Sequence, residues 1–177
     1  MKRAKGEYMI REKVMIFIDG SNLYHSMNDY RQGCRIDFNK FIQILSGDRY
    51  MVRTYYFGTQ HHSSQSSFFD MLQFSVESID VEIKTPKYGK EKGVDVALAI
   101  KFLSLGLKGA FDVGIIVSGD EDYVSAIEEV KGLGIRVEVA SFKNSLSTEL
   151  RKSCDSLITI DDFVEDIILV DENEFNK

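Results

Sequence analysis

The stretch that decides the fold is VMIFI at residues 14–18, an uninterrupted apolar run that stops at Asp19 and Gly20. It lacks the alternation of a strand with one solvated face, so it indicates a strand that helices bury on both sides. A second run, VGIIV at residues 113–117, has the same character. Both runs predict interior strands of a parallel sheet.

Strand-like and helix-like stretches alternate around these two runs. Residues 37–45 have apolar side chains at helical spacing between Asp37, a capping residue, and Gly47, a stop signal. The same patterns predict helices at residues 68–79, 94–105 and 123–133, and strands at residues 51–57, 81–84, 136–140 and 157–160. We expect an α/β protein, a three-layer α/β/α sandwich with a largely parallel central sheet. In such a sheet the ligand site lies beyond the carboxyl ends of the strands.

Length and composition fit one globular domain, since the 177 residues are 44% hydrophobic and 28% charged. We expect the domain at residues 13–168, between tails at residues 1–12 and 169–177. No apolar run approaches the roughly 20 residues of a membrane span, and the start lacks the apolar region of a signal peptide. These features predict a cytoplasmic protein without membrane contact. Cys34 and Cys154, far apart in the sequence, are predicted to be free thiols.

Polar side chains follow the first buried strand in the sequence IDGSN. Asp19 directly follows the strand and Asn22 comes three residues later, so both should emerge where a ligand would lie. Asp, Gly, Ser and Asn are also favoured in turns, and turn chemistry alone is the alternative interpretation.

Acidic residues also follow the second buried strand, in the sequence SGDEDY. Asp120 and Asp122 lie at the mouth of the next predicted helix. A capping Asp stabilises a helix by about 1 kcal/mol, which explains one acid but not three in succession. Asp95 interrupts an otherwise apolar helix start, where an unpartnered charge is costly.

Carboxylates brought together at one edge of a sheet repel one another, so a cation is their natural partner. We predict that the acids at this edge hold a divalent metal: Asp19, Asp95, Asp120 and Asp122. Oxygen ligands favour Mg²⁺ or Mn²⁺ over zinc. The histidines lack convincing ligand spacing and are interpreted as surface residues: His25, His61 and His62.

A net charge of -6 is unfavourable for a phosphate-bearing partner, but a local basic segment compensates for it. The loop KTPKYGKEK leads directly towards Asp95 and should overhang the acidic site. Phosphates are predicted to bind at its lysines Lys87, Lys90 and Lys92, and Tyr88 permits stacking on a base. A solvated lysine loop is the alternative.

Four segments together resemble the NYN domain family, specifically its LabA-like (DUF88) branch within the PIN-like nuclease superfamily: IFIDGSNLY, KGVDVALAI, IIVSGDEDYVSAI and SLSTELRKSCDSLITID. The resemblance runs from about residue 14 to about residue 164. It implies a PIN-like fold and a metal-dependent ribonuclease activity on RNA.

The residues that the resemblance assigns to the site are all present. The acids and the amide of the family pattern match Asp19, Asn22, Asp95, Asp120 and Asp122. Ser118 matches a serine that could order a metal-bound water, and Lys92 matches a basic position before the mid-chain acid. In the late segment, Ser147 and Leu150 either line the cleft or cap a helix and pack.

The sequence therefore predicts an Mg²⁺- or Mn²⁺-dependent endoribonuclease in which a metal-activated water attacks the phosphodiester. The main alternative is a non-catalytic RNA-binding or regulatory protein with the same fold. A phosphatase or phosphotransferase with an aspartate nucleophile is less well supported, because Ser21 occupies the second acidic position of its D-x-D pattern. Receiver-like phosphorylation lacks the late lysine it needs. The resemblance also makes a homodimer a reasonable expectation.

Overall fold

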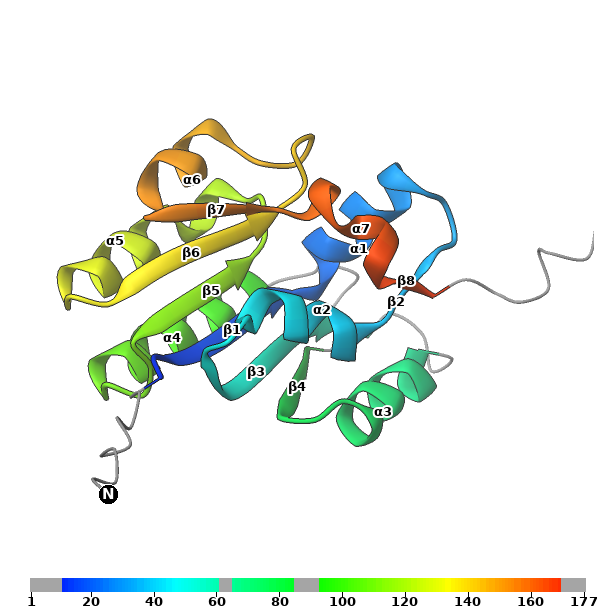
Figure 1. The fold of residues 1–177 in the computed structure, drawn as a ribbon, viewed down its shortest axis with the longest axis horizontal. Helices are drawn as coiled ribbons and strands as arrows, with labels where there is room; N and C mark the ends of the chain where they lie inside the picture. The colour runs from blue at the N-terminus through cyan, green and yellow to red at the C-terminus, as the bar shows by residue number, and fades with distance from the viewer. Residues whose placement is uncertain (1–10, 61–64, 85–92, 170–177) are drawn as a thin grey trace, which may run out of the picture.

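A six-stranded parallel sheet runs through the middle of the molecule in the order β4-β3-β1-β5-β6-β7 (Figure 1). The structure is a computed structural model that describes residues 11–60, 65–84 and 93–169. The strands of the sheet are β1 (Lys13–Asp19), β3 (Tyr50–Thr59), β4 (Ile79–Lys84), β5 (Val113–Val117), β6 (Arg136–Ser141) and β7 (Ser156–Thr159).

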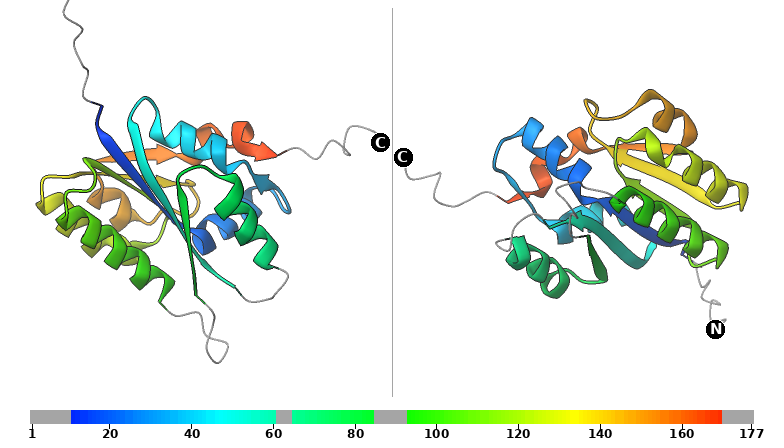
Figure 2. Two further views of the ribbon diagram at one scale, coloured as in Figure 1. Left: turned by 90° about the horizontal axis from the view of Figure 1, so that it is seen from below. Right: turned by 180° about the vertical axis from the view of Figure 1, so that it is seen from behind.

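Helices cover both faces of this sheet, and the view from below in Figure 2 shows the three layers. One face carries α1 (Gly20–Tyr30), α2 (Phe38–Ser46), α3 (Ser66–Ser75) and the short α7 (Val164–Ile167). The other face carries α4 (Val94–Leu107), α5 (Val124–Gly132) and α6 (Thr148–Ser153). The predicted α/β/α sandwich with a parallel central sheet is confirmed.

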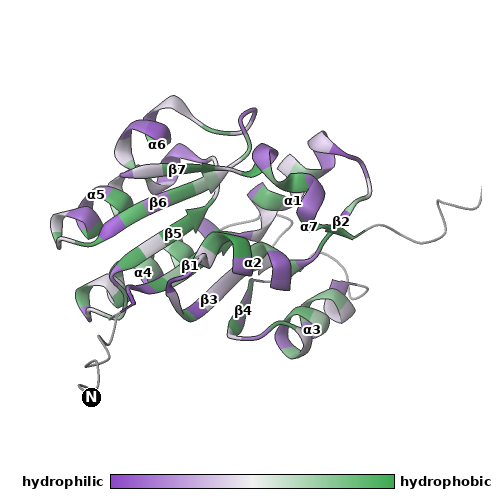
Figure 3. Cartoon of the chain, viewed as in Figure 1, coloured by the Kyte–Doolittle hydropathy of each residue, from purple (hydrophilic) through white to green (hydrophobic). Residues whose placement is uncertain are grey.

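The side chains of β1 explain why its sequence shows no alternation. Ile16 and Ile18 pack into the core beneath α1 and α2, whereas Met15 and Phe17 pack into the core beneath α4 and α5. All four side chains are buried. Figure 3 shows the contrast in hydropathy, since strand β5 is drawn in green and near-white, whereas helix α5 mixes green and purple. Burial on both faces therefore requires an apolar residue at every position of these strands.

The chain order creates a switch point between β1 and β5. From β1 the chain moves outward through β3 to β4, and it then returns through α4 to β5 on the other side of β1. Helices that follow β1 and β5 consequently leave in opposite directions from neighbouring strand ends. Ligands of open α/β sheets bind in the crevice at such a point.

Two predicted helices end or begin differently from their sequence pattern. The helix expected at residues 68–79 stops at Ser75, because Val76 has an extended backbone and donates its N–H to the carbonyl of Leu72. Ser78 then takes a positive φ of 58°, and Ile79 opens β4. Val76 therefore packs into the core from the connection, and Ile79 packs into it from the strand. The helix expected at residues 123–133 follows a 3-10 turn, Glu121–Tyr123.

Helix α1 and a small second sheet were not predicted. Helix α1 begins at Gly20, within the segment whose composition favours a turn, and its N-cap is Asp19. The second sheet pairs β2 (Arg35–Ile36) with β8 (Ile168–Leu169) in antiparallel orientation. This pair closes the fold beside α1 and α2, so Leu169 belongs to the folded part rather than to a tail.

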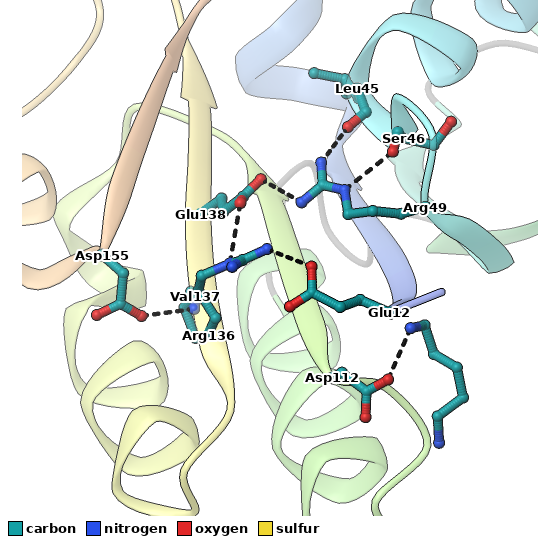
Figure 4. A network of polar contacts seen from close by, with 10 residues as sticks. Glu12, Leu45, Ser46, Arg49, Asp112, Arg136, Val137, Glu138 and Asp155 are labelled. Carbon is teal, nitrogen blue, oxygen red and sulfur yellow. Dashed lines mark hydrogen bonds and ion pairs between the residues drawn. The ribbon is translucent and has the colours of Figure 1, made fainter. Parts of the chain in front are cut away.

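A charged network ties the amino ends of the strands together (Figure 4). Arg49 lies 2.9 Å from a carboxylate oxygen of Glu138, which also pairs with Arg136 at 3.3 Å. The Arg49 guanidinium also donates to the carbonyls of Leu45 and Ser46 at the end of α2. The buried Glu138 charge is thus compensated, and α2 is anchored to the sheet at the edge opposite the strand carboxyl ends.

Both cysteines, Cys34 and Cys154, are free, as predicted. Within the described ranges, no helix has the length and apolar character needed to cross a membrane.

Candidate active site

Asp19 lies at the carboxyl end of β1, beside the switch point, and only 7% of the residue is exposed. One carboxylate oxygen accepts the backbone N–H of Asn22 at 3.0 Å, which caps helix α1. The other accepts the hydroxyl of Tyr123 at 2.9 Å and that of Ser118 at 3.4 Å. Burial raises the pKa of Asp19 above its ordinary value, although these hydrogen bonds oppose the shift.

The loop after β5 is held against the start of α1. The backbone N–H of Gly119 donates to the side-chain oxygen of Asn22 at 3.0 Å. The hydroxyl of Ser118 accepts the backbone N–H of Asp120 at 3.2 Å. Asn22 and Ser118 therefore fix the loop that carries Asp120 relative to Asp19.

Gly119 brings a second loop close to this one. Its carbonyl accepts the backbone N–H of Ser147 at 2.9 Å. A Cβ at this position would lie 2.1 Å from the carbonyl oxygen of Ser145, which leaves no room for a side chain. The glycine of the SGDED sequence is thus required for close backbone approach at the site.

Asp120 and Asp122 have different environments, although both follow β5. Asp120 is half-buried and accepts the backbone N–H of Asp122 at 3.0 Å, which caps the turn Glu121–Tyr123. Its negative charge contributes to raising the pKa of Asp19. Asp122 is exposed, and its backbone, rather than its carboxylate, makes the contact with Asp120.

Asp95 approaches the same group of residues from the first turn of α4. Tyr123 is buried, and its pKa is raised by burial and then by the charges of Asp19, Asp95 and Asp120. The fold therefore brings Asp19, Asp95 and Asp120 into one electrostatic neighbourhood, although they come from three elements far apart in the chain.

Sequence reasoning missed two tyrosines beside Asp19. Tyr123 was predicted only as the start of a helix, but its hydroxyl binds the Asp19 carboxylate. Tyr56 in β3 is buried, and its pKa is raised by burial and by the charge of Asp19. The sequence signal that could have placed Tyr123 at the site is its position at a helix start, three residues after Asp120. Nothing in the sequence around Tyr56 distinguishes it from an ordinary core residue.

The oxygen-rich chemistry of the site fits a hard divalent cation. Asp19 and Asp120 supply carboxylates whose charges disfavour each other, and Mg²⁺ is usually bound by one or two carboxylates together with waters and substrate phosphates. Across residues 11–60, 65–84 and 93–169, no three or more Asp, Glu, His or Cys side chains form a group able to hold a metal between them. Asp19 and Asp120 are thus the two neighbouring carboxylates at this edge, and Asp95 acts on the same tyrosine as they do.

The remaining predicted site residues fall into two groups. The basic loop residues Lys87, Tyr88, Lys90 and Lys92 lie outside the described residues. In the late segment, the hydroxyl of Ser147 accepts the N–H of Leu150 at 3.1 Å to cap α6, and Leu150 is buried in the core. The sequence left open whether these two residues line the cleft or cap and pack. In the structure, Ser147 caps a helix and Leu150 packs in the core.

The fold and site together define an α/β protein with clustered carboxylates at the switch point of a parallel sheet. The chain belongs to the NYN domain family, whose pattern it matches over residues 13–161, as the sequence resemblance predicted. This family places it in the PIN-like nuclease superfamily.

Further comparisons support the fold alone. A crystal structure of a protein of unknown function from Vibrio parahaemolyticus is similar, with a TM-score of 0.76 and 23% identity. The similarity covers 93% of this chain and 100% of that chain. No curated protein matches the sequence.

Proposed function

We propose that this protein is a ribonuclease of the LabA-like (DUF88) branch that depends on Mg²⁺ or Mn²⁺ and cuts RNA internally by hydrolysis. Membership of the NYN family supports a nuclease in general. The proposal adds the metal, the RNA substrate and the residues that act.

The observation that carries the proposal is the environment of Asp19. Its carboxylate is buried and lies close enough to Asp120 for the two charges to disfavour each other. Within the described part of the chain, neither acid forms an ion pair with a lysine or arginine. Burying one carboxylate beside a second, half-buried one without a counter-charge is costly, and a divalent cation removes that cost.

In this proposal, Asp19 and Asp120 would bind the metal directly, and Asp95 and Asp122 would contact it through bound waters. When bound, the metal would activate a water and stabilise the charge that develops on the phosphate. Asp19 and Asp120 lie nearest the switch point, whereas the exposed position of Asp122 favours an outer role, such as contact with metal-bound water.

Other side chains position these acids. The Tyr123 hydroxyl and the Asn22 backbone N–H fix the two oxygens of Asp19, which leaves the carboxylate a single orientation. Ser118 donates to Asp19 and accepts from the backbone of Asp120, so it couples the two strand ends. Fixed groups of this kind reduce the reorganisation needed during reaction.

We further propose that Lys87, Lys90 and Lys92 bind phosphates that flank the cut and that Tyr88 stacks on a base. The loop containing these residues leads into α4, whose first turn carries Asp95. Positive charge beside the acidic site would attract RNA in a manner that weakens with salt.

A non-catalytic RNA-binding protein is the main alternative, and a cleavage assay separates the two. Labelled single-stranded RNA is incubated with purified protein in Mg²⁺, Mn²⁺ or EDTA. We expect metal-dependent cutting that falls by about a hundredfold or more in Asp19→Asn, since loss of a ligand costs several kcal/mol of transition-state stabilisation.

The matched control is Asp80→Asn. Asp80 is a half-buried acid near the amino end of β4, with a long ion pair of 3.5 Å to Arg53. This variant should cut RNA at the wild-type rate. If the wild type and both variants cut no RNA but still bind it, the nuclease proposal is refuted and the non-catalytic RNA-binding protein takes its place.

A further inference from the structure

A cavity of about 530 Å³ lies between α1, α3 and the β2–β8 pair. Its volume falls within the range of sites that take small organic groups. The lining is mainly apolar and aromatic, and it includes residues from β3 as well as from both helices. None of the acids proposed to hold the metal lines this cavity.

The cavity begins directly beside the acidic site. Gly20 and Ser21, which follow Asp19 in the chain, form part of its wall. The ring of Tyr56 also lines it, and the Asp19 charge acts on that same tyrosine. A Cβ at Gly20 would lie 2.3 Å from the Tyr56 hydroxyl, so the glycine allows the wall and the start of α1 to meet. A group bound in the cavity would therefore be a close neighbour of the proposed metal.

Flat aromatic rings are exposed at the mouth of the cavity. Tyr24 of α1 is 66% exposed and Phe68 of α3 is 37% exposed, and both line the cavity. Phe68 makes ring contacts with Phe38 and Tyr56, so the aromatic surface continues inward. Exposed aromatic rings that lead into a concave site are suited to stack on nucleobases.

The wall of the cavity contains a buried hydroxyl that has no hydrogen-bond partner in the described part of the chain. The side-chain oxygen of Thr59 is the buried side-chain polar atom that has no hydrogen bond among the described residues, and Thr59 lines the cavity. A buried hydroxyl without a partner is destabilising, so a ligand with a donor or acceptor would relieve the cost. Once the Thr59 hydroxyl turns towards the cavity, the edge of a nucleobase would supply its missing partner, whereas a purely hydrocarbon ligand would not.

We propose that the cavity receives one base of a single-stranded RNA, next to the phosphate that is cut. The proposal rests on the proposed nuclease function, because the RNA backbone would then pass from the cavity to Asp19. Tyr24 and Phe68 stack on the base, and Thr59 binds its edge. Arg35, exposed and also part of the lining, supplies positive charge for the neighbouring phosphate.

The test measures RNA binding in EDTA, so that it does not depend on cleavage. The probe is a fluorescein-labelled oligoadenylate of about ten nucleotides, a length within the usual site sizes for single strands. We expect Tyr24→Ala and Phe68→Ala to weaken binding of the full chain by about five- to a hundredfold, the range for loss of one base stack.

Phe74→Ala is the matched control, because Phe74 lies on the same helix as Phe68, is 85% exposed and does not line the cavity. Its affinity should equal that of wild type. Thr59→Val provides a second signature, since removal of the unsatisfied hydroxyl should raise the melting temperature while binding weakens. If Phe68→Ala fails to fold, Thr59→Val still tests whether the cavity binds RNA.

Equal affinities of Tyr24→Ala, Thr59→Val and Phe74→Ala would overturn the cavity assignment. Unlabelled AMP should compete weakly and ribose 5-phosphate not at all. If AMP competed as well as unlabelled oligoadenylate, the cavity would serve free nucleotides, and the RNA assignment would fall. If the cavity variants weaken oligoadenylate binding but the wild type cuts no RNA, the base-binding cavity is supported and the proposed nuclease activity is overturned. If the wild type cuts RNA but the cavity variants bind oligoadenylate as tightly as it does, the nuclease activity is supported and the base-binding cavity is overturned.

Discussion

Replacing Gly119 by alanine tests the close packing of the loops around the site. The new methyl group would start 2.1 Å from the carbonyl oxygen of Ser145, and ordinary contacts begin at 3.4 Å. The loop must therefore move by about 1.3 Å, the difference between these distances. This movement would weaken two hydrogen bonds of the loop. The Ser147 N–H donates one to the Gly119 carbonyl, and the Gly119 N–H donates the other to the side chain of Asn22.

The expected cost follows from these contacts. Overpacking of this kind typically costs about 1–3 kcal/mol, and each weakened hydrogen bond adds about 0.5–1.5 kcal/mol. We expect Gly119→Ala to lose about 2–4 kcal/mol of unfolding free energy. For a protein of this size, about 2–4 °C per kcal/mol corresponds to a melting temperature lower by roughly 5–15 °C.

Gly132→Ala is the matched control for the same chemical change. Gly132 ends helix α5, is exposed, and would have no atom within 4 Å of its new methyl group. Alanine there reduces the freedom of the unfolded chain and favours the helix, so we expect a gain of about 0.4–1 kcal/mol. The two substitutions should thus change the melting temperature in opposite directions.

Thermal unfolding followed by circular dichroism, with urea unfolding as a second measure, provides the comparison. Gly119→Ala should also lose ribonuclease activity at temperatures where it remains folded, because its hydrogen bond positions the loop of Asp120. If the two variants were equally stable, or if Gly119→Ala matched wild type in both stability and activity, the close loop approach would be refuted.

Three further predictions concern charge and capping. Burial raises the pKa of Asp19 above 3.8, so ionisation of this carboxylate destabilises the folded protein as the pH rises from 3.8 through the folded pKa. In EDTA, the stability of Asp19→Asn relative to wild type should therefore fall as the pH is lowered towards 3.8, and a relative gain on acidification would contradict this sign. Arg49→Met should lower the unfolding free energy, measured in urea, by about 2–4 kcal/mol because it leaves the charge of Glu138 poorly compensated. The double variant with Glu138→Leu should recover most of this loss, and a double variant as unstable as the summed single variants would argue against coupling. Asp37→Ala should cost about 1 kcal/mol by the same measurement, since Asp37 caps α2, and no loss would show that the cap is dispensable.

The sequence was sufficient for the central strands, and for placing Asp19 and Asp120 at the ends of two of them, because both depend on local patterns. β1 and β5 are apolar at every position, which only burial on both faces demands. Asp37 and Gly47 bounded α2 as predicted, since capping residues act within a few positions. Asp19 and Asp120 follow buried strands, and neighbouring parallel strands bring their ends to one edge.

Features that depend on tertiary packing escaped sequence reasoning. Helix α1 opens on residues that favour turns, and its few buried side chains give only a weak apolar pattern. Its helical form depends on the Asp19 cap and on packing against the sheet. The bond from Tyr123 to Asp19 joins residues 104 positions apart, and the cavity beside Tyr56 exists only once α1 and α3 are in place. No local signal encodes such contacts.

The central claim is that the acids at the switch point hold a divalent metal for nuclease chemistry. Its most direct test is anomalous diffraction from crystals grown with Mn²⁺ and a short RNA analogue whose linkages cannot be cut. We predict a manganese peak at about 2.0–2.3 Å from carboxylate oxygens of Asp19 and Asp120, and its loss in crystals of Asp120→Asn. Wild-type crystals with bound RNA and no manganese at these carboxylates would contradict the account.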